Sequence, residues 1–434
     1  MHFFSTYTAE LEKYTGAVLA APIGSFKEED IGVSLFCTQQ VEKHLRELIP
    51  IEELRDAGSF FTGDVMAEDA VAYFAGSISK NSMILDPTCG AGNLLIACSK
   101  KLPVNRSSLI KTLTLWGRCL AGFDLVPEFV EATKLRLILA AISRKVCPDL
   151  RNLAEAKALL FNIRDANAFD HKATFAKATH IIINPPYYKM KAGESCGWAD
   201  GKINAAAKFM AFIAIHAQNE AHVSAILPDV LRSGTRYEKW RNLISSKLDC
   251  SICSAGRFDS KTDVDVFLLR GQIAAPINAL NWLGVNYSAK TVADYFDITI
   301  GPVVPYRDKK KGPTSPYIHP KILPLWAEIK DSDIEETWEY SGTLKLPPFV
   351  AIRRTSSPSD LYRAGATLIK GTQKIAVENH LIVARPKSGT IKDSKKLLNV
   401  LKDKRTNDFL NQRIRCRHLT VTAVKEIPWI GEKI

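Results

Sequence analysis

The chain has 434 residues, more than one hydrophobic core usually organises, so two domains are expected. Hydrophobic residues make up 46% and charged residues 24%, which excludes a largely disordered chain. The net charge is +12, and it is unevenly placed. Residues 341–434 hold 19 Lys and Arg against 7 Asp and Glu, whereas residues 1–280 hold 32 against 30. This distribution suggests that the C-terminal part of the chain binds a polyanion. The open alternative is that these surface charges only keep the protein soluble.

The nine cysteines are scattered without the framework of a disulfide-rich protein. Cys250 and Cys253 form a lone C-x-x-C with no second pair, so no metal site is expected and free thiols in a reducing compartment fit best. No apolar run approaches the roughly 18 residues of a membrane span, and the N-terminus lacks a signal-peptide pattern. The expected location is the cytoplasm.

In chain order, residues 1–54 carry helix-like spacing and are interpreted as a helical N-terminal extension. From about residue 58 to 275, short apolar runs alternate with amphipathic stretches such as 128–142. This rhythm predicts an α/β fold with a mostly parallel sheet and helices on both faces. Nine of the 21 prolines then fall within 301–360, which indicates a change of domain near 275–290.

A glycine-containing turn follows the first predicted strand. The apolar residues before Asp86 lead through Gly90 and Gly92 into an amphipathic helix. Glycines let the backbone approach a ligand closely, and open α/β sheets bind ligands at this end of their strands. The Gly-Lys-Ser/Thr ending of a phosphate loop is missing. A carboxylate here suits an ammonium or a sulfonium, and a purely structural turn is the open alternative.

Two more acidic residues end the next predicted strands. Asp124 follows Ala-Gly-Phe, and Asp165 follows Asn-Ile-Arg. The first carboxylate can accept hydrogen bonds from both ribose hydroxyls, with helix capping as the open alternative. The second can accept from an adenine amino group. Three acidic strand ends at one crevice describe a pocket for an adenosine that carries positive charge.

The fourth motif is a buried strand, residues 180–183, that ends in Asn-Pro-Pro-Tyr at 184–187. Two prolines fix the backbone and remove two N–H donors. The side-chain oxygen of Asn184 and the carbonyl of Pro185 can then accept both hydrogens of one planar amino group, which localises the nitrogen lone pair. Tyr187 offers a ring for base stacking, an interaction of about 1–3 kcal/mol. A merely structural turn needs neither the strand before it nor the aromatic after it.

With these motifs in this order, the sequence resembles the S-adenosylmethionine-dependent DNA methyltransferases that act on amino groups. The match is closest to the N6-adenine class of restriction-modification systems with the gamma order, in which the catalytic domain comes first. The resemblance implies a Rossmann-like methyltransferase domain at 55–280 and a smaller mixed α+β target-recognition domain at 281–434. It is specific over 55–275 and looser beyond 285.

The resemblance also assigns residues. It implies S-adenosylmethionine as cofactor, and the family's Tyr and Pro around Thr62 are replaced here by Phe61 and Gly63. The residues expected at the cofactor are Phe61, Thr62, Asp86, Thr88, Cys89, Gly90, Gly92, Asn93, Asp124, Leu125, Asp165, Ala166 and Asn184. The residues expected to be catalytic are Asn184, Pro185, Pro186, Tyr187 and Phe258. Phe258 is the candidate to pack against the extruded base, with core packing as its alternative.

The implied reaction is direct methyl transfer to a base flipped out of duplex DNA. The enzyme is expected to be a monomer in a bacterial or archaeal cytoplasm, held at the nucleoid through DNA, with any restriction endonuclease as a separate chain. The charge points to residues 341–434 as the DNA clamp, and truncation near 340 is expected to remove most DNA affinity. The expected DNA-binding residues are Lys309, Lys310, Arg353, Arg354, Lys374, Arg385, Arg413, Arg415 and Arg417.

Several alternatives stay open at this point. The same catalytic motif serves cytosine N4, guanine of ribosomal RNA and protein glutamine, although cytosine enzymes more often carry Ser at the position of Asn184. A non-catalytic DNA-binding protein that keeps the cofactor fold is a further alternative. Residues 148–149 with 155–157 mimic a nuclease signature, but they are predicted to lie on one helix, where metal-binding strands would be needed.

Overall fold

The computed structural model describes residues 2–21, 62–193, 196–257, 264–277, 280–283, 290–308, 311–415 and 417–430. The chain divides into two compact units, Met1–Trp282 and Leu283–Ile434. This division lies next to the domain boundary expected after residue 280. No helix in the described ranges is long and apolar enough to cross a membrane.

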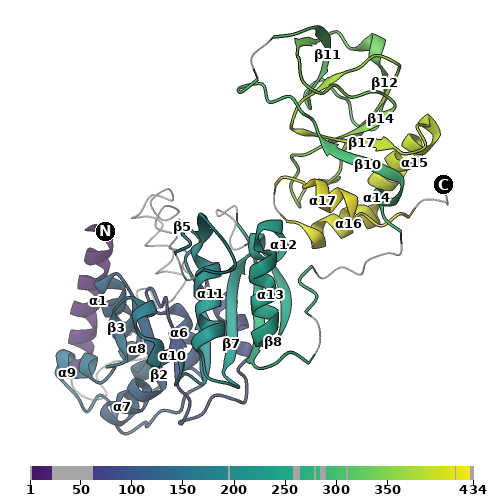
Figure 1. Cartoon of the computed structure of the whole chain (residues 1–434). Helices are drawn as coiled ribbons and strands as arrows, with labels where there is room; N and C mark the ends of the chain where they lie inside the picture. Colours follow the sequence, from purple (N-terminus) through teal and green to yellow (C-terminus); the bar gives the residue numbers. More distant parts are fainter. Residues whose placement is uncertain are drawn as a thin grey trace. The chain divides into compact units, whose positions relative to one another are not determined.

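The first unit is built on a seven-stranded sheet with the order β3-β2-β1-β4-β7-β9-β8. Figure 1 labels β2, β3, β7 and β8 of this sheet. Neighbouring strands from β3 to β7 are parallel, and β9 is antiparallel to both β7 and β8. The mostly parallel sheet of a Rossmann-like α/β fold is therefore confirmed. The strands are β1 (Ile84–Asp86), β2 (Leu120–Asp124), β3 (Ile163–Asp165), β4 (His180–Ile183), β7 (His222–Pro228), β8 (Leu248–Arg257) and β9 (Asp265–Ile273), with a separate hairpin of β5 (Lys189–Lys191) and β6 (Lys202–Asn204).

Two groups of contacting helices flank this sheet. One group is α1 (His2–Ala20), α5 (Asp64–Ala72), α6 (Asn93–Ser99), α7 (Leu109–Cys119), α8 (Pro127–Ser143) and α9 (Leu153–Ala158). The other is α10 (Lys172–Phe175), α11 (Ala205–His216), α12 (Asp229–Ser233) and α13 (Glu238–Lys247). Local sequence explains several of their starts, because proline at the first helical position of α8 and a side-chain cap on α7 both favour helix initiation.

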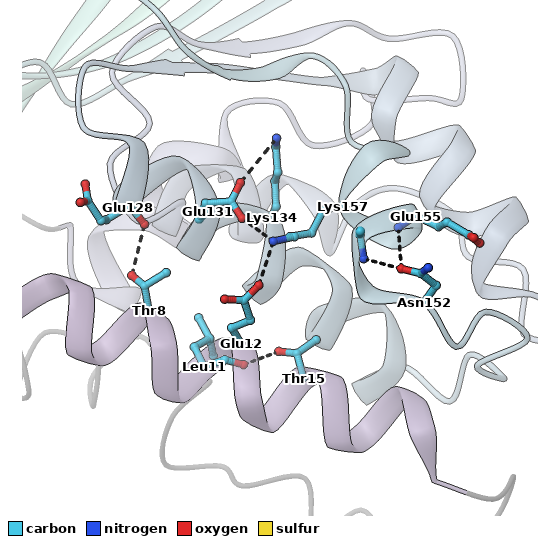
Figure 2. A network of polar contacts seen from close by, with 11 residues as sticks. Thr8, Leu11, Glu12, Thr15, Glu128, Glu131, Lys134, Asn152, Glu155 and Lys157 are labelled. Atoms are coloured by element: carbon cyan, nitrogen blue, oxygen red, sulfur yellow. Dashed lines mark hydrogen bonds and ion pairs between the residues drawn. The ribbon is translucent and has the colours of Figure 1, made fainter.

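The N-terminal helix α1 packs along α8 and belongs to the hydrophobic core of the first unit. Lys157 of α9 donates to Glu12 of α1 at 3.0 Å and to Glu131 of α8 at 2.7 Å, so one ammonium ties three helices together (Figure 2). Thr8 adds a hydrogen bond of 3.3 Å to the carbonyl of Glu128. The described part of the N-terminal extension is thus an integral layer of the first unit.

The expectation of one helix across residues 148–157 is wrong. The helix α9 begins only at Leu153, where the side chain of Asn152 accepts from the backbone N–H groups of residues 154 and 155 (Figure 2). Asp149 instead accepts from the Ser108 hydroxyl and from the Ile110 backbone at the start of α7. Asp149 therefore accepts bonds at the start of α7, and Lys157 forms ion pairs.

The second unit is smaller and mixes helices with strands, as predicted. A five-stranded sheet has the order β10-β17-β14-β15-β12, and a three-stranded sheet has the order β13-β11-β16. The strands are β10 (Phe296–Ile300), β11 (Thr314–Ile318), β12 (Glu328–Lys330), β13 (Thr337–Glu339), β14 (Phe349–Arg353), β15 (Ala366–Lys370), β16 (Ala376–Val377) and β17 (Leu381–Pro386). The helices are α14 (Val292–Tyr295), α15 (Ile391–Lys402), α16 (Lys404–Arg413) and α17 (Val421–Lys425).

Residues 341–434 do not form a unit of their own. The strand β10 pairs antiparallel with β17, and β12 pairs parallel with β15, so strands from before and after residue 340 share one sheet. A truncation near 340 would remove these pairing partners and divide the sheet, and the expected loss of DNA affinity on such a truncation stays a prediction. The division between Trp282 and Leu283 is the structural boundary.

Candidate active site

A cavity of about 490 Å³ opens at the carboxyl ends of the parallel strands in the first unit. It collects residues that follow β1, β2, β3 and β4, as expected for a ligand site of an open α/β sheet. Ten of the residues expected at the cofactor line it: Thr62, Asp86, Thr88, Cys89, Gly90, Asn93, Asp124, Leu125, Ala166 and Asn184.

The glycine turn has the backbone geometry that its sequence predicts. Gly90 and Gly92 have φ angles of +50° and +87°, in the left-handed region that favours glycine. A Cβ on Gly92 would lie 2.7 Å from the side chain of Thr133, whose hydroxyl donates to the Gly90 carbonyl at 2.8 Å. The turn is therefore closed against α8, and this close packing leaves no room for a larger residue at Gly92.

Two carboxylates stand at the base of the cavity. Asp86 is 1% exposed and accepts from the Thr88 backbone at 3.1 Å, and its burial, with the charge of Asp124 nearby, raises its pKa to about 8. Asp124 accepts from the backbone N–H groups of Gly90 and Val126, both at 3.0 Å. Burial also raises the pKa of Asp124. A positive charge in the cavity would favour the ionised form of both groups.

A buried arginine that the motifs did not predict donates hydrogen bonds to the glycine turn. Arg136 of α8 is fully buried and donates to the carbonyl of Ala91 and, at 2.6 Å, to the side chain of Asn93. Asn93 in turn donates to the backbone carbonyl of Thr62 at 2.7 Å. The sequence signal for Arg136 was an arginine within the amphipathic stretch 128–142. These bonds join the segment before α5 to the glycine turn.

Asn184 is held on both sides of its amide. Its Nδ2 donates to the Thr62 hydroxyl at 2.9 Å, and its Oδ1 accepts from the Tyr187 hydroxyl at 2.8 Å. The Thr88 hydroxyl donates to its backbone carbonyl at 3.3 Å. The side chain is therefore fixed at the cavity, with Oδ1 in the role of acceptor.

Tyr187 lies differently from the open stacking ring that the sequence suggested. It does not line the cavity; it packs against the hydrophobic core, and burial raises the pKa of its phenol. The next residue, Tyr188, is 37% exposed and lines the cavity with Pro186. The structure thus assigns Tyr187 a bond to Asn184, and its stacking on a base stays a prediction.

The end of the cavity after β3 departs from the sequence-based expectation. The carboxylate of Asp165 is exposed and does not line the cavity, whereas Asn167 does. Phe169 and Phe209, which the motifs did not predict, face each other with ring centroids 4.5 Å apart. The Lys208 ammonium lies 4.8 Å from the Phe169 centroid. Aromatic side chains, rather than a third carboxylate, therefore form this wall.

The other expected residues take several positions. Gly92 shapes the turn without lining the cavity, and Pro185 is buried next to Asn184. Phe61 and Phe258 lie outside the described residues. Among the described residues, no group of three or more His, Cys, Asp or Glu side chains could hold a metal ion.

The expected DNA-binding residues of the second unit are not equivalent. Lys374, Arg385 and Arg417 are exposed, whereas Arg353, Arg354 and Arg415 are half-buried. Lys309 and Lys310 lie outside the described residues.

The structure corrects the expectation that Arg413 contacts DNA. Arg413 is 4% exposed and forms an ion pair with Glu426, which ties the end of α16 to the segment after α17. Its guanidinium is therefore committed to the fold rather than presented to DNA.

No protein-family model and no curated protein sequence matches the chain. Among solved structures, the type IIL restriction-modification enzyme MmeI in complex with DNA is similar at 10% identity, with a TM-score of 0.52 over 91% of this chain and 70% of that one. The type IIG restriction endonuclease BpuSI follows at 12% identity, with a TM-score of 0.46 over 92% and 62%.

A modification subunit of a putative type I restriction enzyme from Vibrio vulnificus YJ016 is similar at 15% identity, with a TM-score of 0.42 over 66% of this chain. This chain spans 55% of that subunit. At such identities the likeness concerns the fold alone. The likeness to MmeI supports the fold described above.

Proposed function

We propose that this chain is an S-adenosylmethionine-dependent DNA methyltransferase that acts on the N6 amino group of a flipped-out adenine in a specific duplex sequence. The observation that carries the proposal is that Asn184 shares one cavity with the buried carboxylate of Asp86 and the half-buried carboxylate of Asp124. An amide on a rigid Asn-Pro-Pro turn, next to acidic groups, suits an amino substrate beside a cationic adenosine.

The cavity fits S-adenosylmethionine in size and chemistry. Its volume of about 490 Å³ lies in the usual range for small-molecule sites. Asp124 would accept from the ribose hydroxyls, the ionised form of Asp86 would favour the positive charge, and Phe169 with Phe209 would pack against the adenine ring. When bound, the cofactor supplies a methyl group already activated on a sulfonium, so no strong base is required.

Asn184 would hold the target nitrogen. Its Oδ1 and the Pro185 carbonyl accept the two amino hydrogens, which draws the nitrogen lone pair out of conjugation with the base. Thr62 and Tyr187 fix the amide, so its orientation is set before the substrate arrives. Such preorganisation lowers the cost of reaching the reactive geometry. Adenine is favoured over cytosine because Asn, rather than Ser, begins the motif.

Duplex DNA is the proposed partner. The target nitrogen would be buried in a duplex, so the base must leave the stack. Residues 283–434 carry 26 Lys and Arg against 16 Asp and Glu and supply the charge for phosphate contacts. MmeI, which is similar in fold, is a type IIL restriction-modification enzyme whose structure is in complex with DNA. We propose a monomer whose restriction endonuclease, where one exists, is a separate chain.

Expression in a methylation-free host, followed by modification-sensitive sequencing of the host DNA, tests base, site and activity together. The wild-type chain should leave N6-methyladenine at one sequence motif. Asn184→Ala should reduce transfer by at least about a thousandfold, because both the acceptor and its rigid geometry are lost. Its affinity for S-adenosylmethionine, measured by calorimetry, should stay within a few-fold of the wild type.

The matched control is Asn81→Ala, an exposed asparagine outside the cavity, which should methylate like the wild type. Methylation by Asn184→Ala at close to the native rate would refute the role of Asn184. Cofactor binding without any methylated base in DNA would favour another amino substrate or a non-catalytic DNA-binding protein.

A further inference from the structure

Two neighbouring hollows in the second unit meet at Arg353 and Thr355, which line both of them. The first hollow, of about 540 Å³, is completed by Tyr317, His319, Pro320, Lys321, Glu378 and His380. The second, of about 360 Å³, is completed mainly by Leu325, Trp326, Ser356, Leu361, Tyr362 and Gly365. Asp360 and Arg363 also line the second hollow, and the two hollows thus adjoin at one arginine.

The first hollow mixes donors with acceptors. His380 pairs with Glu378 at 2.9 Å, and His319 pairs with Glu336 at 3.1 Å. A phosphate entering this hollow would meet the carboxylate of Glu378, which repels it, as well as the cations of Lys321 and Arg353. The edge of a nucleobase presents both donors and acceptors, so the chemistry of the hollow fits a base edge better than a phosphate.

Arg353 is held rigidly at the end of β14. Its backbone N–H donates to the Gly365 carbonyl and its Nη2 donates to the Leu323 carbonyl, both at 2.8 Å. Its Nε is buried without a hydrogen-bond partner within the described part of the chain. A fixed guanidinium with donors to spare is suited to planar, bidentate recognition.

Further buried polar atoms without a partner lie in these walls and in residues next to them in the chain. Within the described residues, one buried side-chain atom of each of Arg353, Arg354, Ser356 and Asn379 lacks a hydrogen-bond partner. These residues come from the two segments, 353–356 and 378–380, that border the hollows. Of these four residues, Arg353 and Ser356 line a hollow. Buried polar groups are normally paired, so the unpartnered atoms of these two residues favour a ligand at this place.

The second hollow offers aromatic and aliphatic surface. Trp326 has a φ angle of +63°, a left-handed conformation that is rare for a bulky residue and concentrates at functional sites. Its ring meets Tyr362 edge-on at 5.0 Å, and the neighbouring Leu361 is 78% exposed. Such surface suits the face of a base or the methyl group of thymine.

We infer that these two hollows are the base-reading surface of the second unit and that Arg353 reads a guanine in the target sequence. Guanine offers two acceptors in the major groove, and a bidentate arginine is the commonest specific contact to it. The inference rests on the proposed action on a specific duplex sequence. Lys374 and Arg385 line neither hollow, and they would contact phosphates without reading sequence.

Selection of binding sites from a random duplex library with the full-length chain tests this inference without any need for methylation. The wild type should enrich one motif that contains guanine. Arg353→Ala should lose the preference for guanine at one position by roughly ten- to a hundredfold, and Arg353→Lys should also lose it because the fork is gone. His380 is half-exposed, and His380→Ala should weaken the base preference at the same or an adjacent position. This variant tests the inference even if the arginine variants unfold because they lose the bond to Leu323.

The control is Arg405→Ala, which removes an exposed arginine of the same unit that pairs with Asp403 and lines neither hollow. It should keep the motif and lose at most some affinity for all sequences alike. An unchanged motif in folded Arg353→Ala and His380→Ala would overturn the inference, as would a uniform loss of affinity or full rescue by Arg353→Lys. If the wild type enriches no motif, the proposed sequence-specific function itself fails.

Discussion

At the scale of single residues, Asp86 combines a buried position with a charge that the proposed ligand needs. Burial raises its pKa to about 8, so the carboxyl is largely protonated at neutral pH. A cation bound nearby stabilises the ionised form and lowers that pKa, so binding must release a proton. The carboxyl would therefore distinguish a sulfonium from a neutral thioether, and the distinction would depend on pH.

We expect the affinity for S-adenosylmethionine to increase as pH rises towards about 8, by up to about tenfold per pH unit, and to level off above it. Calorimetry in buffers of different ionisation enthalpy would measure both the affinity and the released proton. S-adenosylhomocysteine lacks the positive charge on sulfur and should show a weaker dependence, and Asp86→Asn should show almost none. Equal pH dependence for both ligands would contradict this role of Asp86.

At the scale of secondary-structure elements, two neighbouring strands bring a pair of histidines together below α5. His180 of β4 and His222 of β7 are paired in register, with ring centroids 5.0 Å apart. The His180 ring bonds the hydroxyls of Ser77 and Thr179 at 2.9 and 2.8 Å. Burial and the charge of His222 lower the pKa of His180 to about 4, so both rings pack as neutral groups near neutral pH.

This pair predicts a loss of stability in mild acid. A histidine whose pKa is lower in the folded state contributes stability that is present above its unfolded value of 6.5 and is lost as pH falls towards about 4. The melting temperature of the wild type should therefore fall more steeply between pH 6.5 and 4 than that of His180→Leu. Ser77 and Thr179 keep carbonyl acceptors in that variant, so it should fold. Parallel melting curves across this pH range would contradict the prediction.

The elements of the first unit were predictable where one local pattern decides them. The strand before Asn184 is a continuous apolar run. The turn at Gly90 and Gly92 is predictable because its glycines are close together in the sequence. The aromatic wall was not predictable, because Phe169 and Phe209 meet from segments 40 residues apart in the chain. The bond from Arg136 to the glycine turn likewise depends on how α8 packs. Local sequence thus specified the strand ends, and tertiary packing decided which side chains face the cavity.

At the scale of the whole molecule, charge and architecture agree only in part. The excess of basic residues in 341–434 is a property of the sequence, but the sheet that carries them also needs β10 and β12 from before residue 340. Some of that charge is internal, since Arg363 is fully buried and Arg413 is ion-paired. Formal charge therefore overstates what the second unit can present to DNA, and only exposed or half-buried basic residues are available for phosphate contacts.

The division after Trp282 allows the roles of the two units to be separated. Trp282 packs 5.4 Å from Trp240 and donates to Ser245 at 2.8 Å, so a fragment of residues 1–282 keeps the end of its own core. We expect this fragment to bind S-adenosylmethionine like the full chain, because the cavity lies within it.

The affinity of this fragment for duplex DNA should fall by at least about tenfold, with a shallower salt dependence, since each lost phosphate contact reduces the slope of log affinity against log salt by about 0.9. Fluorescence anisotropy of a labelled duplex at several salt concentrations measures both quantities. Equal affinity and slope for the fragment and the full chain would mean that the basic residues of the second unit serve solubility, because charges that contact phosphate cannot be removed without changing the number of counterions released.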